Sequence, residues 1–165
     1  MTIHKEMFSG DKEEKRPTVM VSGGFDPVHV GHIRMILAAA KYGDVIVIAN
    51  SDQWLHRKKG FVFMEFNSRY EILNSIKGVI LVDSVNDEDG TVCEAIRRHK
   101  PDYFANGGDR GRTNTPEQDV CDKLGVKLLW EIGGDEKIES SSDLIKRSRD
   151  FDPPPRRAHG KKSGR

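Results

Sequence analysis

The stretch that decides the fold reads Gly23-Gly24-Phe25-Asp26-Pro27-Val28-His29-Val30-Gly31-His32. An apolar run, residues 18–22, precedes it, and an alanine-rich amphipathic segment, residues 30–41, follows it. This order predicts a β-strand, a tight turn and an α-helix. The start of a helix offers unpaired backbone N–H groups and the positive end of the helix dipole, which together favour anions. The stretch therefore predicts a phosphate site at a strand-to-helix turn.

The rest of the chain alternates short apolar runs with longer amphipathic segments, a pattern typical of βαβ units. The apolar runs are nearly continuous, as is expected of parallel strands that are covered on both faces. The predicted strands are 18–22, 45–49, 79–82, 103–105 and 126–130, and the predicted helices are 30–41, 69–76, 91–99, 116–124 and 141–149. The sequence thus predicts an α/β protein: a single doubly wound, Rossmann-like domain with a five-stranded parallel sheet. Its ligand site is expected beyond the carboxyl ends of the strands.

We expect this domain to span residues 17–150, with residues 1–16 as a charged N-terminal arm. The arm lacks the apolar segment of a signal peptide. Residues 151–165 contain five Lys or Arg against one Asp, a net charge of +4, and we expect them to form a basic, disordered tail. Because the chain of 165 residues carries +1 in total, the remainder carries −3, which makes nucleic acid an unlikely ligand of the domain.

Composition also indicates the compartment. Cys93 and Cys121 are too few for a disulfide framework and lack Cys-x-x-Cys spacing, so reduced thiols in a cytoplasmic protein are expected. The sequence contains no run of about 20 apolar residues of the kind that spans a membrane, so no membrane partner is expected.

Two helix starts carry capping signals. Ser68 and Glu71 fit a Ser-x-x-Glu capping box, in which each side chain satisfies a backbone N–H at the start of a helix. Thr115 precedes Pro116, a combination that predicts an N-cap followed by a first-turn proline.

The side chains of the quoted turn suit an anion. Gly23 and Gly24 would let the backbone approach a phosphate chain without a Cβ atom in the way. His29 and His32 are three positions apart, so both can face the same anion. Two alternatives stay open: the glycines can serve a tight turn while the histidines cap the helix, or Asp26, His29 and His32 can bind a metal ion. The segment holds no clear further metal ligand.

The pattern Gly-x-Phe-Asp-x-x-His-x-Gly-His resembles the signature of the cytidylyltransferase-like nucleotidyltransferase superfamily. The resemblance extends over residues 18–147. The further matching pieces are Asn50-Ser51-Asp52, Arg57-Lys58-Lys59-Gly60, Arg69, Pro101-Asp102, Gly107-Gly108-Asp109 and Ser140-Ser141-Ser142. The layout is most similar to heptose-1-phosphate adenylyltransferases and glycerol-3-phosphate cytidylyltransferases, and the Asn-Ser-Asp and Gly-Gly-Asp pieces favour the heptose enzymes.

The resemblance implies transfer of a nucleoside monophosphate from ATP or CTP to a phosphorylated sugar or polyol, with release of pyrophosphate. It also implies Mg²⁺ bound with the nucleotide, no metal ligands from the protein, and a homodimer. A phosphate acceptor is largely ionised at neutral pH, since its second pKa is about 6, so the reaction needs no general base. The protein must supply in-line positioning and stabilisation of charge on the phosphates.

The family pattern implies a role for each matching residue. The implied catalytic residues are His29, His32 and Lys58; those that bind acceptor or phosphate are Arg57, Lys59 and Arg69; those that bind the nucleotide are Gly23, Gly24, Phe25, Asp109, Ser140, Ser141 and Ser142. We expect the two lysines on a mobile loop. Structural alternatives are a solvated basic loop at 57–59, a surface ion pair of Arg69, an ordinary turn at 106–108 and a simple N-cap by the serines.

Two departures from the family pattern concern specificity. The segment 133–139 lacks the arginine that precedes the hydroxyl cluster in the glycerol-3-phosphate branch, and Glu139 stands directly before that cluster. Trp54 and the run 61–64 lie where family loops line the acceptor pocket, and they indicate either a less polar acceptor or a packed lid.

Two other functions compete with catalysis. A non-catalytic nucleotide sensor on the same fold would tolerate loss of the histidines and Lys58, which are present here. An interaction protein that uses the basic tail would need interleaved aromatic residues, and the tail has only Phe151. The sequence contains neither a Gly-x-x-x-x-Gly-Lys-Ser/Thr motif nor a Gly-x-Gly-x-x-Gly motif after the first strand.

Overall fold

A central parallel sheet organises the protein in the computed structural model, which describes residues 14–107, 115–134 and 140–151. The strands are β1 (Thr18–Gly23), β2 (Asp44–Ala49), β3 (Val79–Asp83), β4 (Tyr103–Gly107) and β5 (Lys127–Ile132). They lie in the order β3-β2-β1-β4-β5, and every neighbouring pair is parallel. The order reverses between β1 and β4, so the carboxyl end of β1 lies at the topological switch point where such sheets bind ligands. The predicted fold class is confirmed.

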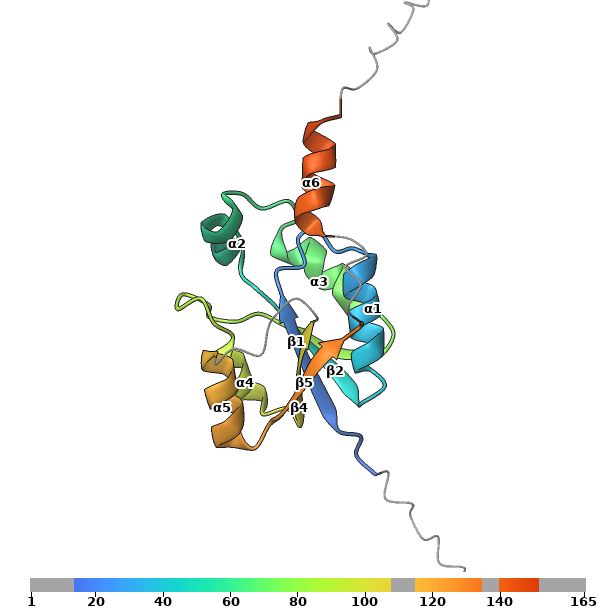
Figure 1. The fold of residues 1–165 in the computed structure, drawn as a ribbon, viewed down its shortest axis with the longest axis vertical. Coiled ribbons are helices and arrows are strands. Elements are labelled where there is room, and N and C mark those ends of the chain that lie inside the picture. The colour runs from blue at the N-terminus through green and yellow to red at the C-terminus, as the bar shows by residue number, and fades with distance from the viewer. Residues whose placement is uncertain (1–13, 108–114, 135–139, 152–165) are drawn as a thin grey trace, which may run out of the picture.

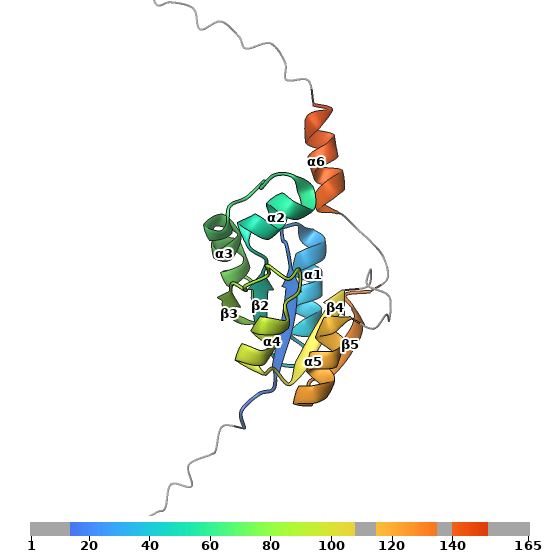
Figure 2. The ribbon, with the colours of Figure 1, turned by 90° about the vertical axis from the view of Figure 1, so that its left-hand side faces the viewer.

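Helices cover both faces of the sheet and its carboxyl edge. In Figure 1, α1 (Val30–Ala39) and α3 (Phe66–Asn74) lie on one face, and α4 (Cys93–His99) and α5 (Pro116–Leu124) lie on the other. Beyond the carboxyl ends of the strands lie α2 (Asp52–Lys59) and α6 (Ser141–Arg149), and the rotated view in Figure 2 shows the same arrangement.

Successive residues of β1 pack against opposite layers of helices. Val19 and Val21 join the core that contains Ile36 of α1, whereas Met20 joins the core that contains Ile96 of α4. All five side chains are fully buried. The nearly continuous apolar strand in the sequence therefore reflects burial on both faces, as the sequence predicts.

One helix was not predicted from the sequence. In α2 only Leu55 is buried, and the last turn is basic, so no apolar stripe marks this helix. Its ends are defined instead by Ser51, whose side chain accepts the N–H of Trp54, and by Gly60, which adopts the left-handed conformation at φ +83°. The predicted mobile loop at 57–59 was therefore wrong: these residues form the end of a capped helix.

The capping box predicted at Ser68 and Glu71 was also wrong, because α3 begins earlier, at Phe66. Its N-cap residue, Glu65, makes no side-chain capping bond. The backbone N–H of Phe66 instead donates to the carboxylate of Asp52, 3.2 Å away. The cap at Thr115 is confirmed: its hydroxyl accepts the N–H of Gln118, and proline follows it at the helix start.

Cys93 and Cys121 are both free and buried, in α4 and α5. Burial raises the pKa of both thiols, that of Cys121 to about 11. Within the described residues, no helix has the length and hydrophobicity needed to span a lipid bilayer. The predicted arm at 1–16 and the tail at 151–165 lie almost wholly outside the described residues.

Candidate active site

The turn between β1 and α1 carries two histidines that cap the helix for each other. His29 is the N-cap residue of α1, and its Nδ1 accepts the backbone N–H of Gly31 at 3.1 Å. The Nδ1 of His32 accepts the backbone N–H of His29 at 3.2 Å. The two rings stack with centroids 3.7 Å apart. The pair therefore forms a capping box in which imidazoles replace the usual hydroxyl and carboxylate.

This capping fixes the tautomer of both rings. A neutral imidazole whose Nδ1 accepts a hydrogen bond must carry its proton on Nε2. Burial, together with the neighbouring His29 and Lys59, lowers the pKa of His32 from 6.5 to about 3. His32 is therefore neutral at pH 7, and its Nε2–H is a donor. The turn presents imidazole donors without the cost of burying an imidazolium at His32.

The expectation that backbone N–H groups at this helix start bind the anion needs correction. The N–H of Gly31 donates to His29 Nδ1, and the N–H of His32 donates to the carbonyl oxygen of His29 at 3.0 Å. Both amides are thus used within the turn. Because both Nδ1 atoms also accept backbone N–H groups, the Nε2 side of the rings is the side that does not serve the cap.

The alternative of a metal site at Asp26, His29 and His32 does not fit this geometry. Asp26 is fully buried, and its carboxylate accepts the backbone N–H groups of Phe63 and Met64. Both imidazole Nδ1 atoms accept backbone N–H groups. No cluster of three or more metal-ligating side chains occurs within residues 14–107, 115–134 and 140–151.

The two glycines of the turn differ in how closely other side chains approach them. A Cβ atom on Gly24 would lie 3.0 Å from Leu55 Cδ2, and one on Gly23 would lie 3.4 Å from the ring of Phe25. Phe25 itself adopts a positive φ of 51° and is 2% exposed, with its ring edge-on to His32 at 4.9 Å. The side chain of Phe25, predicted to bind nucleotide, therefore belongs to the core and supports His32.

The basic residues of α2 point in different directions. The Nζ of Lys59 donates to the carbonyl oxygen of Asp26 at 2.7 Å, which brings this ammonium group to the histidine turn. Burial lowers the pKa of Lys59. The Nζ of Lys58 lies 5.9 Å from the ring centroid of Trp54 on the same helix, and Arg57 donates to the carbonyl oxygen of Asp87 at 2.7 Å. Lys59, predicted to bind phosphate, thus lies beside the histidine turn, whereas Lys58, predicted to be catalytic, lies beside Trp54.

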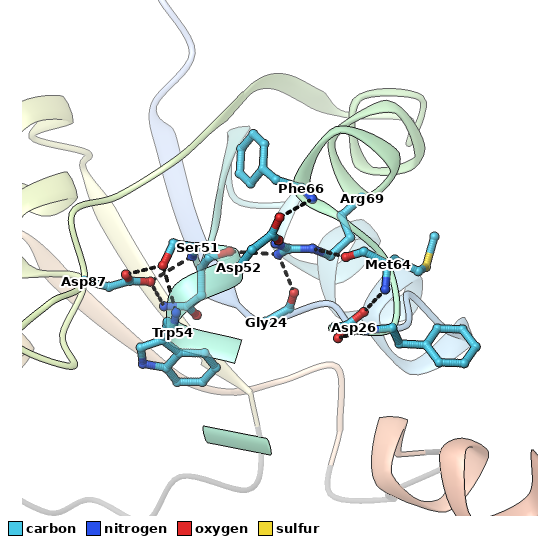
Figure 3. A network of polar contacts seen from close by, with 11 residues as sticks. Gly24, Asp26, Ser51, Asp52, Trp54, Met64, Phe66, Arg69 and Asp87 are labelled. Carbon is cyan, nitrogen blue, oxygen red and sulfur yellow. Dashed lines mark hydrogen bonds and ion pairs between the residues drawn. The ribbon is translucent and has the colours of Figure 1, made fainter. Parts of the chain in front are cut away.

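Arg69 lies inside the protein, where protein oxygens accept hydrogen bonds from each nitrogen of its guanidinium. It is 0% exposed and ion-paired with Asp52 at 2.6 Å (Figure 3). Its other N–H groups donate to the carbonyl oxygens of Gly24, Asn50 and Met64 at 2.8–2.9 Å. The predicted contact with an acceptor does not fit this position, and a surface ion pair does not describe it either.

Asp87 is a buried anchor that sequence reasoning missed. Its carboxylate accepts the amide of Asn50, the backbone N–H of Ser51 and, at 2.6 Å, the hydroxyl of Ser51. Asp87 lies in the loop after β3, within an acidic run that resembles an exposed turn in sequence. The quoted Asn50-Ser51-Asp52 piece was the available signal, because three polar residues directly after a buried strand need partners.

The serines at the start of α6 differ in their contacts. Ser140 caps the helix: its hydroxyl accepts the N–H of Asp143 and donates to the carboxylate of Asp143. Ser141 donates to the carbonyl oxygen of Pro27 at 3.0 Å, which brings α6 to the histidine turn. Ser142 is exposed in the first turn. Asp109 and Glu139 lie outside the described residues.

Comparison with known protein families identifies the family of this chain. Residues 20–147 match the family described as cytidylyltransferase-like. The chain belongs to this family. Its predicted resemblance to cytidylyltransferase-like nucleotidyltransferases is thereby confirmed, and the matched range contains the histidine turn, α2 and the start of α6.

This chain covers different shares of the length of its relatives. The bifunctional protein HldE of Aliarcobacter butzleri is 33% identical over 132 residues, which make up 78% of this chain and 26% of that protein. An FAD synthase of Methanobrevibacter ruminantium is 28% identical over 81% of this chain and 93% of its own length. The crystal structure of the lipopolysaccharide core biosynthesis protein from Thermoplasma volcanium GSS1 superposes with a TM-score of 0.59 at 25% identity, covering 69% of this chain and 93% of that one.

Proposed function

We propose that this protein transfers a nucleoside monophosphate from ATP or CTP to a sugar phosphate or polyol phosphate and releases pyrophosphate. The observation that carries the proposal is the pair of stacked, reciprocally capped imidazoles at the carboxyl end of β1. The caps occupy Nδ1 of both rings and hold them at a topological switch point, where doubly wound sheets bind nucleotides. Family membership over residues 20–147 supports the same reaction class.

The reaction asks the protein for positioning and charge stabilisation. An acceptor phosphate oxygen attacks the α-phosphorus, the bond from that phosphorus to the β-phosphate oxygen breaks, and pyrophosphate leaves. His29 and His32 donate to α-phosphate oxygens, where charge develops in the transition state. Because burial lowers the pKa of His32, the ring enters the reaction as a neutral imidazole and acts as a hydrogen-bond donor through Nε2–H.

Lys59 supplies a positive charge at this site. Its ammonium group is held at the turn by the carbonyl oxygen of Asp26, and its remaining N–H groups are available to a phosphate oxygen. Lys58 and Arg57 lie on the more exposed side of α2, where they are placed to attract the phosphates of an approaching substrate.

Magnesium, if it takes part, is proposed to arrive bound to the triphosphate. The carboxylates of Asp26, Asp52 and Asp87 are engaged by backbone N–H groups, Arg69 or Ser51. Mg²⁺ needs several oxygen ligands in octahedral geometry, and the described carboxylates near the turn do not provide them. The described residues thus fit substrate phosphates and do not fit a magnesium ion held by the protein.

A substrate panel tests the proposal. Pyrophosphate release is measured with each of the four NTPs against glycerol 3-phosphate and a set of aldose 1-phosphates, in the presence of Mg²⁺. We expect release only with one NTP and one acceptor class together. His32→Asn is expected to abolish most of the pyrophosphate release. His99→Asn is the control: His99 lies at the end of α4, where it is paired with Asp83 of β3, and its substitution is expected to leave the release unchanged.

The competing function, a non-catalytic nucleotide-binding regulator, gives the opposite result. It would show NTP binding in calorimetry together with no turnover for any pair in the panel. That outcome would overturn the transferase proposal and leave the fold and family assignment intact.

A further inference from the structure

Strands β1 and β2 separate just beyond their last paired residues. Gly23 is opposite Ala49 in the register, and the N–H of Asn50 donates to the carbonyl oxygen of Gly23 at 2.9 Å. The next two carbonyl groups, those of Gly24 and Asn50, have no N–H partner in the opposite strand. Both instead accept from the same nitrogen of Arg69, NH1, at 2.8 Å each. A buried guanidinium therefore bridges the two strand ends at the point where they separate.

The other nitrogens of Arg69 hold two further segments. NH2 pairs with the carboxylate of Asp52 in the first turn of α2, and Nε donates to the carbonyl oxygen of Met64 between α2 and α3. Figure 3 shows Arg69 between these groups, with the indole of Trp54 on the far side of Gly24. Asp52 uses its second oxygen to cap α3 at Phe66. One side chain thus joins four segments that surround the candidate site.

The segment that Arg69 binds at Met64 is also bound by Asp26 of the histidine turn. Asp26 accepts the N–H groups of Phe63 and Met64, while Arg69 binds the carbonyl oxygen of the same Met64. The backbone of Asp26 in turn accepts from Lys59, and the neighbouring Pro27 accepts from Ser141 of α6. Hydrogen bonds therefore link Arg69 to the histidine turn, to Lys59 and to the start of α6.

We propose that Arg69 is a positioning residue for nucleotidyl transfer, which holds the histidine turn and α2 at a fixed distance so that the imidazole donors and Lys59 converge on the phosphates. The inference rests on the proposed function for its kinetic consequences. It depends on geometry rather than on charge, because the planar guanidinium offers N–H donors in fixed directions that an ammonium group cannot match. Arg69 has no exposed surface and therefore acts through the residues it holds.

Arg69→Lys tests the geometric part of the proposal, since it keeps the positive charge and removes the planar arrangement of N–H donors. We expect kcat to fall by about 100-fold, the effect of misplacing reacting groups by roughly 1 Å, while KM for the NTP changes much less. Arg98→Lys is the matched control: Arg98 is 40% exposed and bridges Asp83 and Glu94 on the surface, so kcat is expected to stay unchanged. An Arg69→Lys protein with normal kcat per folded molecule would overturn the proposal.

Asp52→Asn provides a second route if Arg69→Lys does not fold. Asparagine keeps an oxygen acceptor for Arg69 and removes the charge of the pair. We expect an intermediate loss of kcat, about tenfold, with a circular dichroism spectrum like that of the wild type. If Asp52→Asn lowers stability but not kcat, the network is merely structural and the proposal fails.

A double variant and a spectroscopic readout separate this proposal from the proposed function. If Arg69 acts through the histidine turn, Arg69→Lys combined with His32→Asn will lower kcat by less than the product of the single effects. Independently of activity, NMR of the His32 ring in Arg69→Lys should show a pKa raised towards 6.5, because a loosened turn admits water. If the pKa of His32 is the same in Arg69→Lys as in the wild type, the positioning role is overturned, whether or not any substrate pair gives turnover. If the pKa is raised but no substrate pair gives turnover, only the proposed transferase function is overturned.

Discussion

His32 accepts the backbone N–H of His29 through Nδ1 at 3.2 Å. The same ring therefore caps the start of α1 and, in the proposed reaction, donates to a phosphate. Its Nδ1 side is structural and its Nε2 side is available for phosphate. Because the two nitrogens have separate tasks, substitutions can separate them. Asparagine places an oxygen near the position of Nδ1, whereas glutamine places an N–H donor near the position of Nε2.

We therefore predict opposite outcomes for two variants of His32. His32→Asn keeps an acceptor for the N–H of His29 and loses the phosphate donor, so kcat falls by about 100-fold or more with little loss of stability. His32→Gln keeps a donor and loses the cap, which costs about 1 kcal/mol of stability, while kcat falls less. Pyrophosphate release and urea unfolding measure the two effects. Equal loss of rate in both variants would contradict the division of tasks.

The low pKa of His32 predicts a pH dependence of stability. In the unfolded chain the ring protonates near its ordinary pKa of 6.5, but in the folded protein only near 3. Between these values the unfolded state binds one more proton, so stability rises with pH by about 1.4 kcal/mol per unit and levels off above 6.5.

His32→Asn isolates this contribution, because other titrating groups such as Asp83 are common to both proteins. We expect the stability difference between wild type and His32→Asn to increase from pH 4.5 to pH 6.5 in urea unfolding, and to stay constant from pH 7 to pH 8. A difference that does not vary with pH would show that His32 is not held neutral by burial.

The two lysines at the end of α2 should differ in their effect on the rate. Lys59→Met removes the ammonium group held beside the histidines by Asp26, so we predict a kcat lowered by about 10- to 100-fold. Lys58→Met removes a cation that lies over Trp54, so we predict a small change in kcat and a higher KM. Steady-state kinetics of both variants measures this difference. The reverse order would favour the assignment made from the sequence.

Close packing between the turn and α2 makes Gly24 sensitive to substitution. In Gly24→Ala the new Cβ would lie 3.0 Å from Leu55 Cδ2, and we predict a loss of about 1 kcal/mol or more from overpacking. Leu55→Val in the same chain should recover part of that loss. Gly23→Ala, whose Cβ would meet the Phe25 ring at an ordinary 3.4 Å, is the control. Thermal unfolding of the wild type, Gly24→Ala, the Gly24→Ala/Leu55→Val double variant and Gly23→Ala measures these differences in stability. A Gly24→Ala protein as stable as Gly23→Ala would contradict the prediction.

The features that could be predicted from the sequence are those whose interacting residues are neighbours in the chain. β1 and β2 are marked by their own apolar residues, Thr115 caps the helix that follows it directly, and the histidine turn lies within ten consecutive residues. In each case the interacting groups are neighbours in the chain, so their spacing alone predicts the structure.

Features set by distant partners could not be predicted. The start of helix α2, although capped locally by Ser51, is held in place by residues far along the chain, Asp87 and Arg69. The backbone N–H that opens α3 is bound by Asp52, 14 residues before Phe66. The burial of Arg69 depends on carbonyl groups of two strands and one loop, whose convergence follows only from the sheet order. Nothing near Arg69 in sequence distinguishes it from a surface arginine.

The contacts of helix α6 with the body include the buried Ile145, the hydroxyl of Ser141 on Pro27 and the guanidinium of Arg149 over the ring of Phe61. Engineers who wish to change the substrates of this scaffold can therefore replace this helix as a cassette. Exchanging it leaves the Arg69 framework in place, because Arg69 bonds to Gly24, Asn50, Asp52 and Met64, and these residues all precede α6 by far in the chain.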